Sequence, residues 1–93
     1  MGYVFENKTV VITGAAKGIG EGIARKFADA GANLVLSDHS EEVTETAERL
    51  REEYHENIIS FVADVTNEEQ VTELYRLAHH TFGTIDVLSL IHI

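Results

Sequence analysis

The chain has 93 residues, a formal net charge of −9 and 44% hydrophobic residues, with no cysteine. This length fits one small domain, and the hydrophobic content argues against wholesale disorder. The acidic balance argues against nucleic acids and anionic membrane surfaces as partners, because both attract clustered Lys and Arg. The lack of cysteine excludes disulfide and thiolate chemistry. No apolar run approaches the roughly 20 residues that span a bilayer, so we expect a soluble, cytoplasmic protein.

The N-terminal part predicts a strand followed by a helix. The run TVVIT, residues 9–13, is β-branched and apolar at consecutive positions, which is typical of a strand buried on both faces. Residues 18–30 carry apolar side chains at helical spacing, and Gly31 is the expected C-terminal glycine. The apolar positions of this predicted helix are Ile19, Ile23, Phe27 and Ala30.

The middle part repeats the alternation. Residues 34–37 predict a second buried strand, and Ser40 is placed to cap the helix that follows. Residues 58–63 predict a third strand. The apolar stripe of the second helix consists of Val43, Ala47, Leu50 and Tyr54.

The last part predicts a third helix and a fourth strand. The stretch TNEE matches a capping box, in which Thr66 bonds forward and Glu69 bonds back. Gly83 ends the helix, and residues 85–88 open the fourth strand. The apolar stripe of the third helix consists of Val71, Leu74, Tyr75, Ala78 and Phe82.

The order βαβαβαβ predicts an α/β fold with a parallel sheet and right-handed crossovers. It corresponds to the first half of a doubly wound, Rossmann-type fold with strand order 3-2-1-4. One face of the sheet should carry the first two helices and the other face the third. Ligands in such sheets bind beyond the carboxyl ends of the strands, where the order reverses between the first and fourth strands.

The stretch TGAAKGIG, residues 13–20, lies at that end and leads into the first helix. A helix N-terminus has unpaired N–H groups and a partial positive charge, so it attracts phosphate. Gly14 permits a tight turn, Gly18 permits close approach of a pyrophosphate, and Gly20 permits close packing of helix on strand. Position 16 is Ala, so the spacing is not GxGxxG, and a glycine-rich turn without a ligand is the alternative.

Asp38 ends the second predicted strand, 18 residues beyond Gly20. A carboxylate at this place accepts hydrogen bonds from the adenosine ribose, and its charge repels a 2′-phosphate, which favours NAD over NADP. The alternative is an exposed turn residue. Lys17 argues in the other direction, because a lysine in the loop could pair with a 2′-phosphate; it could equally be solvated.

These residues together resemble the short-chain dehydrogenase/reductase family, over about residues 5–88. The matching positions are Thr13, Gly14, Gly18 and Gly20 in the motif TGxxxGxG, the acidic Asp38, the pair Asp64 and Val65, and FGTIDVL at residues 82–88. The resemblance implies a homo-oligomeric parent protein that uses NAD to interconvert a small-molecule secondary alcohol and a ketone.

The resemblance also implies further roles in binding the cofactor. Ile19 would offer a backbone N–H to the pyrophosphate, Asp64 would accept from the adenine amino group, and Val65 would pack near the ring. The alternative for Asp64 is a turn residue ahead of Thr66. No metal site is expected, since the adjacent His79 and His80 point about 100° apart on a helix.

The chain departs from the family pattern after residue 88, where it reads SLIHI. The catalytic Ser and the Tyr-x-x-x-Lys pair of the family have no counterpart, so we assign no catalytic residue and expect the chain alone to be inactive. We expect residues 1–88 to form the N-terminal half of a dinucleotide-binding domain. Residues 89–93 would then be a non-family tail at a truncation junction. The alternative to part of an oxidoreductase is that the chain is a non-catalytic nucleotide-binding or interaction module.

Overall fold

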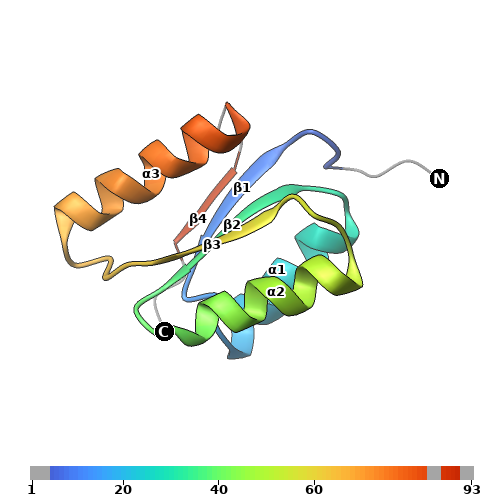
Figure 1. Ribbon diagram of the computed structural model, residues 1–93, viewed down its shortest axis with the longest axis horizontal. Helices are drawn as coiled ribbons and strands as arrows, with labels where there is room; N and C mark the ends of the chain where they lie inside the picture. The colour runs from blue at the N-terminus through green and yellow to red at the C-terminus, as the bar shows by residue number, and fades with distance from the viewer. Residues whose placement is uncertain (1–4, 84–86, 91–93) are drawn as a thin grey trace.

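The computed structural model describes residues 5–83 and 87–90, and strands and helices alternate along them as the sequence predicts (Figure 1). The elements are β1 (Thr9–Thr13), α1 (Gly18–Asp29), β2 (Asn33–Asp38), α2 (Glu42–Glu53), β3 (Ile58–Val62), α3 (Glu68–Phe82) and β4 (Val87–Leu90).

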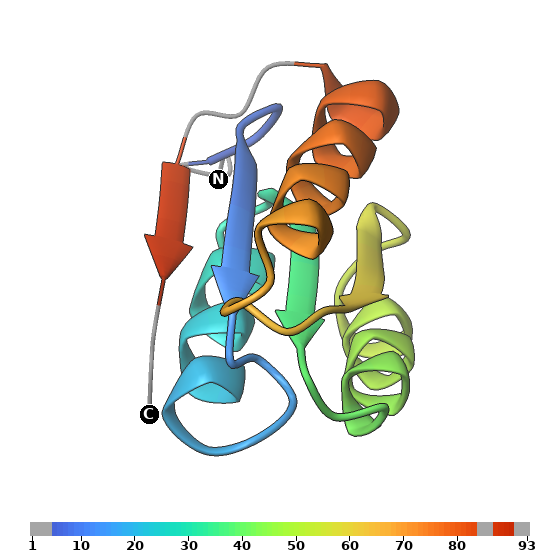
Figure 2. The ribbon, with the colours of Figure 1, turned by 90° about the vertical axis from the view of Figure 1, so that its left-hand side faces the viewer.

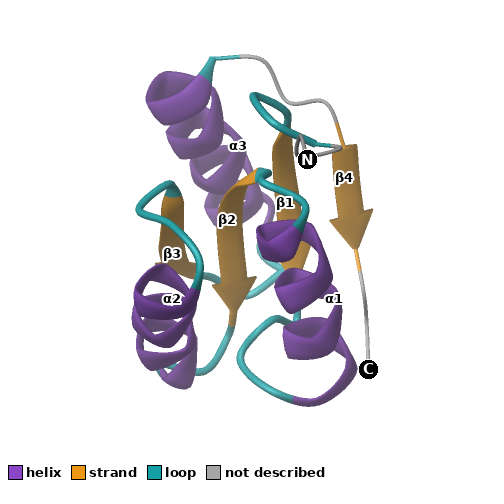
Figure 3. Ribbon diagram, turned by 90° about the vertical axis from the view of Figure 1, so that its right-hand side faces the viewer, coloured by secondary structure: helices purple, strands orange, loops and turns teal. Residues whose placement is uncertain are grey.

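The four strands form one parallel sheet in the order β3-β2-β1-β4. Helices α1 and α2 lie against one face of the sheet, and α3 lies against the other (Figures 2 and 3). This arrangement is a doubly wound, Rossmann-type α/β fold. Thr13 pairs with Ser37, and Asp38 pairs with Val62, so β1, β2 and β3 end at the same edge of the sheet. The segments that follow these strands therefore meet there.

The core has two layers, because the central strands are covered on both faces. Val10 and Ile12 of β1 belong to the cluster under α1 and α2, whereas Val11 belongs to the cluster under α3. β2 alternates in the same way. All three of these β1 side chains are fully buried, which explains why the strand is apolar at consecutive positions. β3 is less deeply covered, and its Val62 is 43% exposed.

The buried face of α1 differs from the predicted one. The helix buries Gly20, Ala24 and Ala28, while Ile19 is 64% exposed. Ile23 and Phe27 are partly buried and pack at the side of this face. Small residues let the helix backbone approach the strands and the preceding loop closely, and this close approach, not the size of the apolar side chains, sets the rotation of α1.

The predicted cap of α3 is wrong by one residue. Asn67 is the cap, and its Oδ1 accepts from the backbone N–H groups of Glu69 and Gln70 at 3.0 and 3.2 Å. Thr66 is engaged elsewhere, since its N–H and its hydroxyl both donate to Oδ1 of Asp64. A local turn built on the aspartate thus takes the threonine out of the helix start.

The other helix ends agree more closely with the sequence. Glu41 holds the cap position of α2 without a side-chain bond, but the Ser40 hydroxyl still accepts from the N–H of Glu42 at 3.2 Å. Gly31 and Gly83 follow α1 and α3 with positive φ of 88° and 86°, values that glycine adopts without steric cost.

The fourth strand extends beyond the predicted residues 85–88. β4 covers Val87–Leu90, so Ser89 and Leu90 belong to a strand that pairs with Ile12 and Thr13. The first two positions of the predicted strand, 85 and 86, lie outside the described residues. So do residues 91–93 of the predicted tail.

Candidate functional site

A pocket of about 640 Å³ lies at the edge of the sheet where β1, β2 and β3 end. Each of these strands supplies the segment that follows it, so three stretches far apart in the sequence meet around one space. The pocket is lined by Thr13, Gly14, Ala16, Lys17, Gly18, Asp38, His39, Ser40, Ala63, Asp64 and Val65. Of the predicted site residues, only Ile19 and Gly20 do not line it.

The loop between β1 and α1 has two positions that require glycine. Gly14 and Gly18 have φ of 68° and 64°, a conformation that L side chains rarely adopt. A Cβ on Gly18 would meet nothing within 4 Å, so the backbone there faces open space. α1 then starts after Lys17 without a side-chain cap. Its first N–H groups thus have no capping side chain, which suits an anionic ligand.

Gly20 serves a different purpose, because it is buried and faces the loop. A Cβ at this position would collide with the carbonyl oxygen of Gly14. The first turn of α1 therefore rests directly on the loop backbone, and only glycine permits that contact. The predicted close packing at Gly20 is present, but its partner is the loop and not the strand.

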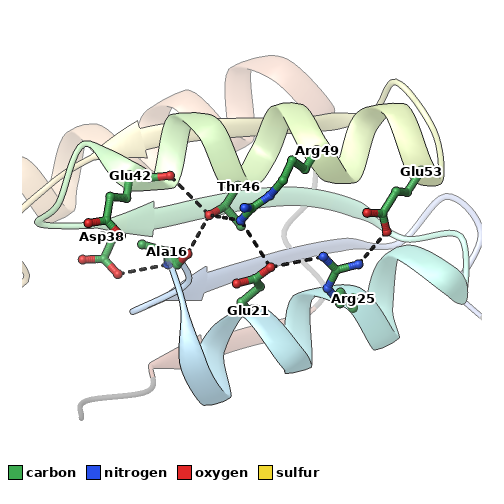
Figure 4. A network of polar contacts seen from close by, with 8 residues as sticks. All are labelled: Ala16, Glu21, Arg25, Asp38, Glu42, Thr46, Arg49 and Glu53. Carbon is green, nitrogen blue, oxygen red and sulfur yellow. Dashed lines mark hydrogen bonds and ion pairs between the residues drawn. The ribbon is translucent and has the colours of Figure 1, made fainter.

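Asp38 reaches from the end of β2 to the loop, as Figure 4 shows. Its Oδ2 accepts from the backbone N–H of Ala16 at 3.0 Å, and its Oδ1 accepts from the N–H of Ser40 at 3.0 Å. The side chain is 10% exposed, and Nδ1 of His39 lies 3.1 Å from Oδ1. A carboxylate has about four lone-pair sites, so the group retains capacity for a ligand hydroxyl on Oδ2, which has only the bond from Ala16.

The remaining predicted residues line the pocket with different degrees of exposure. Lys17 and Asp64 are exposed, and Val65 is half-buried. Asp64 receives the two bonds from Thr66, and its own N–H donates to Oε1 of Gln70 at 2.6 Å. Asp64 therefore forms the turn proposed as its alternative role while it also lines the pocket.

Sequence reasoning missed Thr46, which lies on α2 and holds the loop from outside the pocket. Its hydroxyl donates to the carbonyl oxygen of Ala16 at 2.6 Å, and the residue is 1% exposed. A signal was present, because Thr46 falls on the buried stripe of α2 beside Val43, Ala47 and Leu50. A hydroxyl on such a stripe needs a partner, although the sequence does not show which one.

Charged side chains join α1 to α2 behind the loop (Figure 4). Arg49 donates to Oε2 of Glu21 at 3.3 Å, and Arg25 donates to Glu21 and to Glu53 at 3.2 and 2.5 Å. The hydrogen bond to Glu53 raises the pKa of Arg25, because it favours the charged form of the guanidinium. None of these four residues lines the pocket, so their charges act on the packing of the two helices.

Within residues 5–83, no group of three or more His, Cys, Asp or Glu side chains is arranged to hold a metal ion. The same part of the chain contains no helix long and apolar enough to cross a membrane.

A doubly wound sheet with a glycine-rich loop at a helix start and a carboxylate at the end of the next strand defines the dinucleotide-binding class of α/β folds. A family model described as enoyl-(acyl carrier protein) reductase matches residues 14–91. Together with the relatives and structures below, this match shows that the chain belongs to the short-chain dehydrogenase/reductase family.

The similarity extends to curated and solved proteins. Oxidoreductase UcpA of Escherichia coli K12 is 46% identical over 81 residues, which are 87% of this chain and 30% of the relative. A short-chain dehydrogenase/reductase from Burkholderia phymatum, solved in complex with NAD, is 37% identical with a TM-score of 0.85, over 95% of this chain and 31% of that one. L-Sorbose reductase from Gluconobacter frateurii, solved with NADPH and L-sorbose, is 32% identical with a TM-score of 0.86. The match covers 95% of this chain and 34% of that one. The chain thus spans about a third of the length of these proteins.

Proposed function

We propose that this chain forms the dinucleotide-binding part of an oxidoreductase and that its preferred cofactor is NAD. The observation that carries the proposal is the contact between Asp38 and the glycine-rich loop, 3.0 Å from carboxylate to the N–H of Ala16, at the wall of one pocket. A dinucleotide needs a carboxylate for its ribose beside a glycine-rich loop for the adjoining diphosphate, and Asp38 and the loop provide this pair.

Each part of the site would hold one part of the dinucleotide. The loop at Gly14 and Gly18 and the backbone N–H of Ile19 would bind the diphosphate, since the start of α1 carries no side-chain cap. The remaining lone pair of Asp38 would accept from a ribose hydroxyl. Asp64 and Val65 line the pocket at the end of β3 and would lie beside the adenine.

The preference for NAD rests on charge. A carboxylate that is only 10% exposed repels a second phosphate on the ribose more strongly than a solvated one would. Lys17 also lines the pocket, but it is exposed, so solvent screens its attraction for such a phosphate. Asp38 therefore outweighs Lys17 in choosing between the two cofactors.

The parent protein would interconvert a small-molecule secondary alcohol and a ketone, with the bound nicotinamide supplying or accepting hydride. The chain would contribute the cofactor site, and the acid/base groups would come from outside these residues. We accordingly expect no turnover from the 93-residue chain with NAD and an alcohol.

The test is calorimetric titration of the chain with NAD and with NADP. We expect NAD to bind more tightly by at least about tenfold, the order of effect of one unfavourable charge contact. Asp38→Asn removes the charge and the bond from Ser40 but keeps an oxygen that can accept from Ala16, so it should reduce the preference without releasing the loop. Asp29→Asn, an exposed change at the far end of α1, is the matched control. Tighter binding of NADP, or no binding of either dinucleotide, would contradict the proposal.

A further inference from the structure

The backbone of Ala16 is held on both sides by side chains that come from other elements. Asp38 at the end of β2 accepts from its N–H at 3.0 Å, and Thr46 on α2 donates to its carbonyl oxygen at 2.6 Å. Both partners are distant in sequence, by 22 and 30 residues. The conformation of the loop at this point is therefore imposed by the sheet and by α2 together (Figure 4).

The bond from Thr46 fixes more than one atom, because a peptide unit is planar. The described peptide bonds are all trans, so the N–H of Lys17 points opposite to the carbonyl of Ala16. With that carbonyl turned onto α2, its lone pairs stay away from the pocket that Ala16 and Lys17 line. A rotation of this peptide would instead present a carbonyl oxygen to a bound anion and repel it.

Thr46 is well placed to prevent such a rotation. It is 1% exposed, so water cannot readily replace its hydroxyl. Nη2 of Arg49 donates to the Thr46 oxygen at 3.2 Å and also to Glu21 in the first turn of α1. A donor to the hydroxyl oxygen polarises the O–H group and strengthens the bond that this group donates in turn.

The hydroxyl does not depend on the loop for a partner. The carbonyl oxygen of Glu42, one turn earlier in α2, lies 3.2 Å from it, the usual alternative for a threonine within a helix. The hydroxyl oxygen lies closer to the carbonyl oxygen of Ala16, at 2.6 Å, than to this alternative. The threonine could thus satisfy itself locally, and its bond to the loop is of consequence mainly for the loop.

We propose that Thr46 is a positioning residue of the dinucleotide site, which holds the Ala16–Lys17 peptide with its carbonyl on α2 and away from the bound diphosphate. The inference rests on the proposed function for the identity of the ligand. The positioning itself is a property of the chain without a ligand, so the two can be tested separately.

The variants are chosen to isolate the hydroxyl. Thr46→Val keeps the shape of the side chain and removes the donor, whereas Thr46→Ser keeps the donor. Thr46→Ala forms a second pair with Thr46→Ser, because these two differ only by the hydroxyl and remain informative if the valine variant does not fold. Thr44→Val, an exposed change on the same helix, is the matched control.

The first measurement is amide hydrogen exchange of the unliganded chain by NMR, with the amide of Ala24 in α1 as an internal reference. The Ala16 amide lies in the neighbouring peptide unit, and opening of the loop breaks its bond to Asp38 together with the bond from Thr46 to the Ala16 carbonyl. Without the Thr46 hydroxyl, opening costs one hydrogen bond less, so we expect Thr46→Val and Thr46→Ala to raise the exchange rate of this amide about tenfold relative to Ala24. Thr46→Ser and Thr44→Val should leave this ratio unchanged. Equal changes at both amides would show a purely structural role and overturn the proposal.

The second measurement is calorimetric titration of the same variants with NAD. Thr46→Val and Thr46→Ala should bind about tenfold more weakly, and Thr46→Ser should restore the affinity to within about twofold. Unchanged affinity in the two variants without a hydroxyl would overturn the positioning role. If the unmodified chain binds no NAD, the proposed function fails, and the exchange ratio alone decides the role of Thr46.

Discussion

The two turns that face each other across the pocket are built in different ways. The loop after β1 is held by long-range contacts, from Ser37 to Ala15 and from Asp38 and Thr46 to Ala16. The side-chain contacts of the turn after β3 are local, since Asp64 accepts from the N–H of Thr66 at 2.9 Å and Asn67 caps α3. Both line or adjoin the same pocket, but side chains of other elements hold the first, whereas the turn after β3 has one long-range bond, from the N–H of Ala63 to the carbonyl oxygen of Asp38 at 2.9 Å.

This difference follows from what each turn must do. The β1–α1 loop leaves backbone N–H groups without side-chain caps, so its conformation cannot come from its own hydrogen bonds and must be imposed by neighbours. The β3–α3 turn satisfies its backbone with its own Asp and Asn side chains. Changes in the first should therefore alter the site, whereas changes in the second should alter mainly the stability of α3.

The largest effect is expected where the loop touches α1. Gly20→Ala would drive a methyl group into the carbonyl oxygen of Gly14, at a cost of about 3 kcal/mol or more in unfolding free energy. The loop would shift with it, so NAD binding should be lost as well. Urea denaturation and calorimetry measure the two effects.

Gly22→Ala is the control for that change. It lies one position beyond the first turn of the same helix, and a Cβ there meets nothing within 4 Å. Alanine should stabilise the chain by about 0.5–1 kcal/mol through its higher helix propensity. If both substitutions had the same effect, the close contact between Gly20 and the loop would be refuted.

An intermediate effect is expected at the start of α3. Asn67→Ala removes the cap and should lower the unfolding free energy by about 1 kcal/mol, with NAD affinity unchanged. Thr66→Val, which changes the residue that the sequence alone suggests as the cap, should cost less. A larger loss at Thr66, measured by urea denaturation, would show that the capping box forms after all.

The smallest effect is expected at the ion pairs between α1 and α2. Arg49→Met removes the contact to Glu21, in which the Arg49 side chain is 53% exposed. Solvent screens such a pair, so the loss should be about 0.5 kcal/mol or less and should vanish in molar salt. A loss that persists at high salt would mean that Arg49 acts through Thr46 more than through Glu21.

Several features of the fold could be predicted because they depend on local pattern. The β-branched run of β1 and the apolar stripe of α2 indicate their elements, and the alternation of strands and helices indicates a parallel sheet. The face of α1 could not be predicted in this way. Ile19 falls at the helical spacing expected of a buried residue, yet its side chain is exposed. The contact between Gly20 and the loop turns the helix so that Ile19 points outward.

The candidate site was predicted in its position and in most of its residues. Gly14, Gly18 and Asp38 line one pocket, as a glycine loop and a strand-end carboxylate at the same sheet edge should. The bonds from Asp38 and Thr46 to Ala16 were not predicted. They join residues 22 and 30 positions apart, and nothing in the spacing of the side chains specifies such a pair.

The sequence by itself determined which segments form strands and helices, and therefore that a glycine-rich loop and Asp38 meet at the carboxyl edge of the sheet. The spacing of the apolar residues identifies the strands and helices, because side chains repeat with a different period in each. The right-handed crossovers between parallel strands then place the ends of these strands at one edge of the sheet. Only the tertiary structure decided how the loop is held. The orientation of the two peptides that flank Ala16 depends on the distances between β2, α2 and the loop, which are set by the packing of the whole sheet and its helices.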